Sequence, residues 1–282
     1  MKRVLGLVVG LLVALGVSTP AYAAGEFVIN SLNTAFFKGF ENLFNSQGQY
    51  KAPSIPVVGD YLAGIFNIQD INVGGNPPHF ESDSSPVDQI SGIFAQQVTS
   101  VVQTGVNSYF ITFGTPTIST FCNGADCFNT GLVGDEMFRV YRDIGGTAFA
   151  AGSTMADGVA RSTDGTLWLS LTATGGYAYG EPTDQFGQPK GNAFLGLNVV
   201  FNGTGYEFAL VNDPGESLFN NNVYLYSTAE FGSNSIGGTP WDTELNDPAV
   251  VLPVGIIPEP TSMALMGLGL VGMAIRRKKL VA

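Results

Sequence analysis

The central pattern of the chain is the segment Asp60-Tyr61-Leu62-Ala63-Gly64-Ile65-Phe66-Asn67-Ile68-Gln69, which returns 28 residues later as Asp88-Gln89-Ile90-Ser91-Gly92-Ile93-Phe94-Ala95-Gln96-Gln97. Both copies begin with an aspartate and have a Gly-Ile-Phe centre. Short apolar runs that end at turn residues are typical of β-strands. We therefore expect two neighbouring, similarly placed strands of one sheet. Two copies are too few for a solenoid, which needs about three repeats or more.

Strand-like segments continue along the chain on both sides of this pair. They are short and rich in β-branched and aromatic residues, and they lie at 109–113, 137–142, 166–172, 194–201, 206–210 and 223–227. Turn sequences such as Asp164-Gly165 and Asn202-Gly203 stand between them, and no long helical pattern follows Pro53. The segment 27–44 fits either a helix or an aromatic-rich strand, and Gly39 favours the strand. The pattern predicts an all-β fold, a single β-sandwich of which the jelly roll is one form.

The chain begins with the pattern of a secretory signal peptide. Lys2 and Arg3 precede an apolar run at 4–17, and the small-residue sequence Ala21-Tyr22-Ala23 follows. This order predicts cleavage before Ala24 and export from the cytoplasm. The predicted organisation is a signal peptide at 1–23, a β-sandwich body at 24–257 and a separate C-terminal segment at 258–282.

That C-terminal segment has three unlike parts in a fixed order. The triplet Pro258, Glu259 and Pro260 comes first, an apolar run at 261–275 follows, and the last part is basic: Arg276, Arg277, Lys278 and Lys279. As a helix the run would be about 22 Å long, which is short for a hydrocarbon core of about 30 Å unless the bilayer thins and the basic side chains reach outward. The basic cluster would stay in the cytoplasm. We predict a short transmembrane helix that anchors the body outside.

This order of elements resembles the PEP-CTERM sorting signal of Gram-negative bacteria, whose partner is a membrane-embedded exosortase. The resemblance covers the last 25 residues. It implies that Pro258, Glu259 and Pro260 form the recognition triplet, that 276–279 acts as the stop, and that the tail is removed near the triplet. Proteins with this tail are typically associated with exopolysaccharide, biofilm or floc matrix, and their bodies vary widely. The tail implies a transient membrane anchor, then a surface or extracellular location, and no particular activity.

The body between the two sorting segments is strongly acidic. It holds six Lys and Arg residues against 22 Asp and Glu. Because phosphate binding needs clustered cations, nucleic acid is excluded as a partner. The two cysteines, Cys122 and Cys127, flank a Gly-containing turn. In an oxidising compartment such a close pair predicts a local disulfide.

The sequence offers little for catalysis or for a metal. His79 is the only histidine, no Gly-x-Ser-x-Gly elbow precedes a helix, and no regular calcium loop is present. Paired carboxylates for glycoside hydrolysis stay open because the acids are numerous, and Asp126, Asp164 or Asp213 could join an irregular calcium site. We expect no enzyme, no cofactor and no metal. A candidate sugar-stacking platform consists of four aromatic residues, whose other interpretation is ordinary core packing: Trp168, Tyr177, Tyr179 and Trp241.

The combined evidence predicts a secreted structural or interaction protein of the cell surface or extracellular matrix. The second hypothesis is a lectin-like module that binds glycan through the aromatic platform. The third is a carbohydrate-active enzyme. The first differs from the others because it needs neither a ligand pocket nor a reacting pair of carboxylates.

Overall fold

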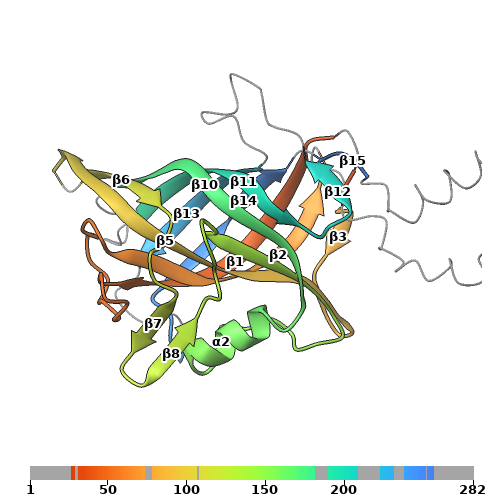
Figure 1. The fold of residues 1–282 in the computed structure, drawn as a ribbon, viewed down its shortest axis with the longest axis horizontal. Helices are drawn as coiled ribbons and strands as arrows, with labels where there is room; N and C mark the ends of the chain where they lie inside the picture. Colours follow the sequence, from red (N-terminus) through yellow and green to blue (C-terminus); the bar gives the residue numbers. More distant parts are fainter. Residues whose placement is uncertain are drawn as a thin grey trace, which may run out of the picture.

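The fold is known from a computed structural model (Figure 1), which describes residues 27–28, 31–73, 78–106, 108–181, 190–208, 223–231, 238–251 and 253–256. The elements within these residues are β1 (Asn33–Phe44), β2 (Tyr61–Asn72), β3 (Phe80–Glu81), β4 (Asp83–Ser84), β5 (Val87–Gly105), β6 (Ser108–Gly114), β7 (Thr120–Asn123), β8 (Asp126–Asn129), β9 (Phe138–Ile144), α2 (Met155–Ser162), β10 (Thr166–Glu181), β11 (Lys190–Asn202), β12 (Tyr206–Phe208), β13 (Val223–Phe231), β14 (Thr243–Val251) and β15 (Pro253–Ile256). The prediction of an all-β body is confirmed.

Eleven strands form one antiparallel sheet that closes on itself. Hydrogen bonding runs from β2 through β1, β14, β13, β11 and β10 to β6 and β5, and β5 then pairs with β2. Strands β9 and β6 lie end to end between β5 and β10: β9 pairs with 88–94 of β5, and β6 pairs with 97–105. In Figure 1 the long strands wrap around a common interior.

The two similar segments at 60–69 and 88–97 are neighbours, as predicted. They form β2 and the first half of β5, and their pairing closes the sheet, with Gly64 opposite Phe94, Ile65 opposite Ile93 and Phe66 opposite Gly92. The glycine of each copy thus faces the phenylalanine of the other. A Cβ on Gly92 would lie 2.3 Å from the Arg139 carbonyl oxygen and 2.5 Å from the ring of Phe66, so this position needs a glycine.

The sandwich predicted from the sequence differs from this arrangement in one respect. The strands belong to one closed sheet, and its opposite walls face each other across a shared core in the way that two layers would. The reason lies in the length of β5, 19 residues, which pairs with β2, β9 and β6 in turn and so joins both walls.

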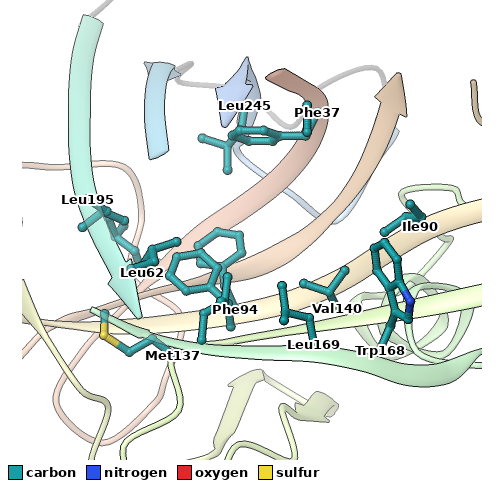
Figure 2. Packing of buried hydrophobic residues seen from close by; sticks show 14 of the residues in the cluster. Phe37, Leu62, Ile90, Phe94, Met137, Val140, Trp168, Leu169, Leu195 and Leu245 are labelled. Atoms are coloured by element: carbon teal, nitrogen blue, oxygen red, sulfur yellow. The ribbon is translucent and has the colours of Figure 1, made fainter. Parts of the chain in front are cut away.

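Side chains alternate between two hydrophobic clusters, because successive residues of a strand point to opposite faces. The inner cluster contains one or more residues from each wall, among them Phe37, Leu62, Phe94, Val140, Leu169, Leu195 and Leu245 (Figure 2). On β1, Phe37 and Leu43 belong to the inner cluster, whereas Phe40 and Phe44 belong to an outer one. The interior of the closed sheet is therefore a packed core.

The outer cluster is covered by the β7–β8 hairpin and by α2, a helix that the sequence analysis did not predict. Phe121, Phe128, Met155 and Val159 pack there against β1, β2 and β5. The helix has only eight residues, and its N-cap Thr154 accepts a hydrogen bond from the Asp157 backbone at 3.0 Å. Asp126 of the hairpin accepts two more backbone hydrogen bonds, from Met155 at 2.6 Å and Ala156 at 3.2 Å. Tertiary contacts stabilise a helix too short to stand alone.

The segment 27–44 is a strand from Asn33 onward, as favoured, but 243–251 was not predicted as one. It forms β14, which pairs with both β1 and β13 although it contains Pro248. The ladder to β13 is interrupted between Leu245 and Ala249, and the residue without a backbone N–H lies in this interruption. The proline is thus tolerated in a central strand.

The predicted signal peptide at 1–23 and the predicted transmembrane segment at 258–282 lie outside the described residues. Among the residues that the structure does describe, no helix has the length and hydropathy needed to cross a membrane.

Candidate functional site

The two tryptophans of the candidate sugar-stacking platform are buried on opposite faces of the sheet. Trp168 is 8% exposed and belongs to the inner cluster (Figure 2), where its ring stacks on Phe27 with centroids 5.8 Å apart. Trp241 is fully buried in the outer cluster, and its Nε1 donates a hydrogen bond of 2.7 Å to the Ala151 carbonyl. The structure does not bring these two rings together on one surface.

Tyr177 and Tyr179 lie on β10, the strand that also carries Trp168 nearer its start. Their backbone pairs with Phe194 and Asn192 of β11 on one side and with Thr112 and Phe110 of β6 on the other. Their side chains are outside what the structure describes, so sugar stacking by these two tyrosines stays a prediction.

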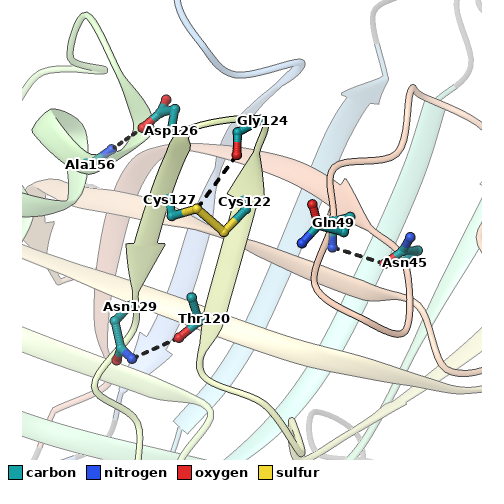
Figure 3. Close-up of a disulfide and its surroundings, with 9 residues drawn as sticks. All are labelled: Asn45, Gln49, Thr120, Cys122, Gly124, Asp126, Cys127, Asn129 and Ala156. Atoms are coloured by element: carbon teal, nitrogen blue, oxygen red, sulfur yellow. Dashed lines mark hydrogen bonds between the residues drawn. A yellow bond between two sulfur atoms is a disulfide. The ribbon is translucent and has the colours of Figure 1, made fainter.

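The predicted disulfide between Cys122 and Cys127 is present. It joins directly opposed residues of β7 and β8, with an S–S distance of 2.06 Å (Figure 3). The hairpin it closes carries Asp126, which binds the N-terminus of α2, and Phe121 and Phe128, which pack in the outer cluster. The disulfide therefore stiffens the layer that covers the outer face of the sheet.

Replacing both cysteines by serine should lower the free energy of unfolding by about 2 kcal/mol, the loop-entropy value for a ring of about six residues. The loss should concentrate in the hairpin and α2, because Asp126 would be held less firmly. Urea unfolding followed by tryptophan fluorescence measures the total, and hydrogen exchange of the α2 amides locates it. An unchanged midpoint for the double variant would contradict the assigned role of the disulfide.

Of the three aspartates considered for calcium, none lies in a cluster of ligands within the described residues. Asp126 binds the helix terminus, Asp213 lies outside the described residues, and Asp164 accepts a hydrogen bond of 2.9 Å from the Thr147 backbone. No group of three or more His, Cys, Asp or Glu side chains suited to a metal occurs in the part of the chain that the structure describes.

Asp164 has a second neighbour, the buried carboxyl of Asp143. Asp143 is 4% exposed and accepts hydrogen bonds from Gln89 Nε2 at 3.1 Å and the Gly146 backbone at 3.1 Å. Burial and the negative charge of Asp164 raise the pKa of Asp143 above its ordinary value. Because this pKa is raised in the folded state, the stability that the Asp143 carboxyl contributes is complete at low pH and is lost as the pH rises through the pKa.

Asp164→Asn should therefore raise the free energy of unfolding at pH 7, by at most about 1 kcal/mol for a pair with one exposed member. The asparagine can still accept the Thr147 hydrogen bond, so the change removes mainly the charge. Chemical unfolding at pH 4 and pH 7 should show the gain only at the higher pH. The control is Asp135→Asn, which removes an exposed charge outside this pair and should change neither value. An equal gain at both pH values would contradict the repulsion.

Another buried carboxyl, that of Glu41 on β1, lies among the core strands. It is 3% exposed, stands on the same strand face as Phe37 and Leu43, and is paired in register with Gly64 of β2 and Thr243 of β14. A Cβ on Gly64 would come within 2.9 Å of the Glu41 Cβ, so β1 and β2 approach closely here. Burial raises the pKa of Glu41 to about 8. The folded state therefore favours the neutral carboxyl near pH 7.

The chain leaves the body through a small two-stranded sheet. β12 pairs antiparallel with β15, with Tyr206 opposite Ile256 and Glu207 opposite Gly255. Tyr206 is buried in the inner cluster, and Phe27 contacts both Tyr206 and Phe208 edge-on, at centroid distances of 5.1 and 5.7 Å. β15 ends at Ile256, two residues before the predicted triplet Pro258-Glu259-Pro260.

These features define an all-β body whose last strand leads directly into a C-terminal sorting segment. A family model described as the PEP-CTERM protein-sorting motif matches residues 257–278, which begin immediately after β15. The C-terminal segment thus carries a PEP-CTERM sorting motif, and this motif indicates an exosortase-targeted surface protein. Neither the curated proteins nor the solved structures yield a match to this chain.

The triplet and the basic cluster were accessible to sequence reasoning because they are linear motifs. The buried acids Glu41 and Asp143 were missed, since their burial depends on which strand face they occupy. One signal was available for Glu41. It stands in an apolar, aromatic-rich run between Phe40 and Leu43, where a charged residue is unexpected.

Proposed function

We propose that the protein is a structural or interaction component of the exopolysaccharide, biofilm or floc matrix, released to the surface after its tail is removed near Pro258. The observation that carries the proposal is the sorting motif at 257–278 behind a folded, disulfide-bonded, acidic body. The body contributes a rigid closed sheet, and the tail supplies a transient membrane anchor and the exosortase as partner. We propose no catalytic activity, cofactor or metal.

A deletion strain of the producing bacterium tests this role. We expect weaker aggregation and less protein in the extracellular matrix, both restored by the wild-type gene. A gene encoding Pro258→Ala, Glu259→Ala and Pro260→Ala together should restore neither, because the body would not be released. Mass spectrometry of the released protein should find a C-terminus that lacks 276–279. Unaltered aggregation and matrix in the deletion strain would refute the proposed role.

Glycan binding is the alternative proposal, and its support is narrower than the sequence suggested. Trp168 and Trp241 are buried, so the tyrosines of β10 remain from the original platform. Binding of the producer's own polysaccharide, lost in a Tyr177→Ala and Tyr179→Ala variant that keeps wild-type stability, would favour a lectin-like function over a purely structural one.

A further inference from the structure

The strand that precedes the sorting motif has unusual properties for the last element of a fold. β15 has the sequence Pro253-Val254-Gly255-Ile256, and its described partner is β12 alone. Proline cannot donate to a ladder and glycine weakens a strand. The register also shifts between Glu207 and Phe208 of β12. The β12–β15 ladder is therefore weak, because it has few residue pairs and includes a proline and a glycine. An isolated two-stranded sheet is marginally stable at best.

The partner strand β12, in contrast, is held in place without β15. Asn202 Nδ2 donates to the Tyr206 carbonyl at 2.6 Å, Asn202 Oδ1 accepts from the Thr204 backbone at 3.0 Å, and Thr204 Oγ1 accepts from the Tyr206 backbone at 3.0 Å. The Tyr206 ring is buried in the inner cluster. The position of β12 is therefore fixed by bonds that do not depend on β15.

The spacing between β15 and the motif limits what a processing enzyme can reach. When β15 is paired, Ile257 alone separates it from Pro258, a reach of about 3.5 Å. When β15 is released, its four residues are added to Ile257 ahead of Pro258, and this stretch can extend about 17 Å. Enzymes that bind an extended peptide take several consecutive residues into their groove. A groove at a membrane cannot accept those residues while they are part of the folded body.

We propose that β15 is a latch, which separates from β12 so that the sorting enzyme can bind the chain on the body side of Pro258, and which pairs with β12 again after cleavage. This inference rests on the proposed sorting and processing of the tail. It assigns to Pro253 and Gly255 a functional reason: they keep the ladder weak enough to open while the rest of the sheet stays closed.

The test locks the latch with a second disulfide. Glu207 and Gly255 are directly opposed, and opposed Cα atoms in antiparallel strands lie about 4.5–5.5 Å apart, within the range of about 4.4–6.8 Å that a disulfide needs. The two native cysteines already pair with each other. We compare the Glu207→Cys and Gly255→Cys double variant with each single variant, in the full chain exported by the producing bacterium. Mass spectrometry verifies the cross-link and measures removal of the tail.

We expect the cross-linked double variant to keep its tail, with at least a tenfold loss of processing, while each single variant is processed as the wild type is. Inserting six Gly and Ser residues after Ile256 in the double variant should restore processing. The insertion lengthens the free chain between β15 and Pro258 while the cross-link keeps β15 paired. Processing of the cross-linked protein at the wild-type rate would overturn the proposal, and so would failure of the insertion to restore it. A wild-type protein that keeps its tail would instead refute the sorting on which the latch rests.

Discussion

At pH 9, Glu41→Gln should unfold with a free energy roughly 4 kcal/mol larger than that of the wild type, and at pH 5 the two should agree within about 1 kcal/mol. Glu41 is 3% exposed on the core face of β1, and burial raises its pKa from 4.5 to about 8. Glutamine has nearly the shape of the protonated carboxyl and carries no charge at any pH. The variant therefore removes the cost of ionising a group inside the sheet.

The sign follows from the direction of the shift. Because the pKa of Glu41 is raised, the folded state holds its proton where the unfolded chain has lost it. The stability contributed by the neutral carboxyl is complete below about pH 4.5 and is lost as the pH rises to about 8, at about 1.4 kcal/mol for each pH unit. The wild type should thus become steadily less stable over this interval, and the variant should not.

Urea unfolding at several values between pH 4.5 and pH 9 measures this difference. The control is Asp135→Asn, which removes an exposed carboxyl and should not give this gain at pH 9. Parallel profiles for wild type and Glu41→Gln would show that Glu41 is ionised in the folded protein, contrary to its buried position.

Trp241→Ala should lower the free energy of unfolding by about 3–5 kcal/mol, the usual cost of emptying a large aromatic site in a core. The ring is fully buried under the β7–β8 hairpin, 5.8 Å from the ring of Phe128. Truncation would also leave the Ala151 carbonyl without the indole N–H that now binds it at 2.7 Å. The β7–β8 hairpin would thus lose the contact that its Phe128 makes with the residues just before β14.

The control for this variant is Trp241→Phe, which keeps an aromatic ring and removes the indole hydrogen bond. We expect it to lose about 1–3 kcal/mol, and thus less than the alanine variant. Urea unfolding and near-ultraviolet circular dichroism follow both. If Trp241→Ala kept wild-type stability while losing affinity for a polysaccharide, Trp241 would be a binding residue and its assignment to the core would be wrong.

The strands could be predicted where the sequence alternates or carries apolar runs between turn residues. The paired segments at 60–69 and 88–97 were recognised as neighbours because they repeat the same pattern, and the ladder from Ile68 to Tyr61 confirms it. The closure of the sheet could not be predicted, since it depends on one long strand, β5, changing partners along its length.

Two elements were missed because local preferences opposed them. β14 contains Asn246, Asp247 and Pro248, which are typical of a turn, yet the ladder with β1 continues through all three. Helix α2 has eight residues and depends on Thr154 and on Asp126 from a distant hairpin. In both cases tertiary contacts outweigh the preference that a short window of sequence expresses.

The predictions about the candidate site also separate into those that depend on adjacent residues and those that depend on tertiary contacts. The sorting triplet and the disulfide are properties of adjacent residues, so the sequence sufficed to predict them. The environment of an aromatic residue is not such a property. Trp168 is buried in the inner cluster and Trp241 in the outer one, each against an aromatic residue far away in the sequence, Phe27 and Phe128 respectively.

The pairing of β1 with β14 also has a consequence for biogenesis. Asn33, near the start of the body, is opposite Val251, near its end, so one edge of the first strand has no partner until more than two hundred further residues have been translocated. Folds that depend on such distant partners form slowly, and an open strand edge invites association with other chains. We therefore expect the newly exported polypeptide to be prone to association with other chains until residue 251 arrives.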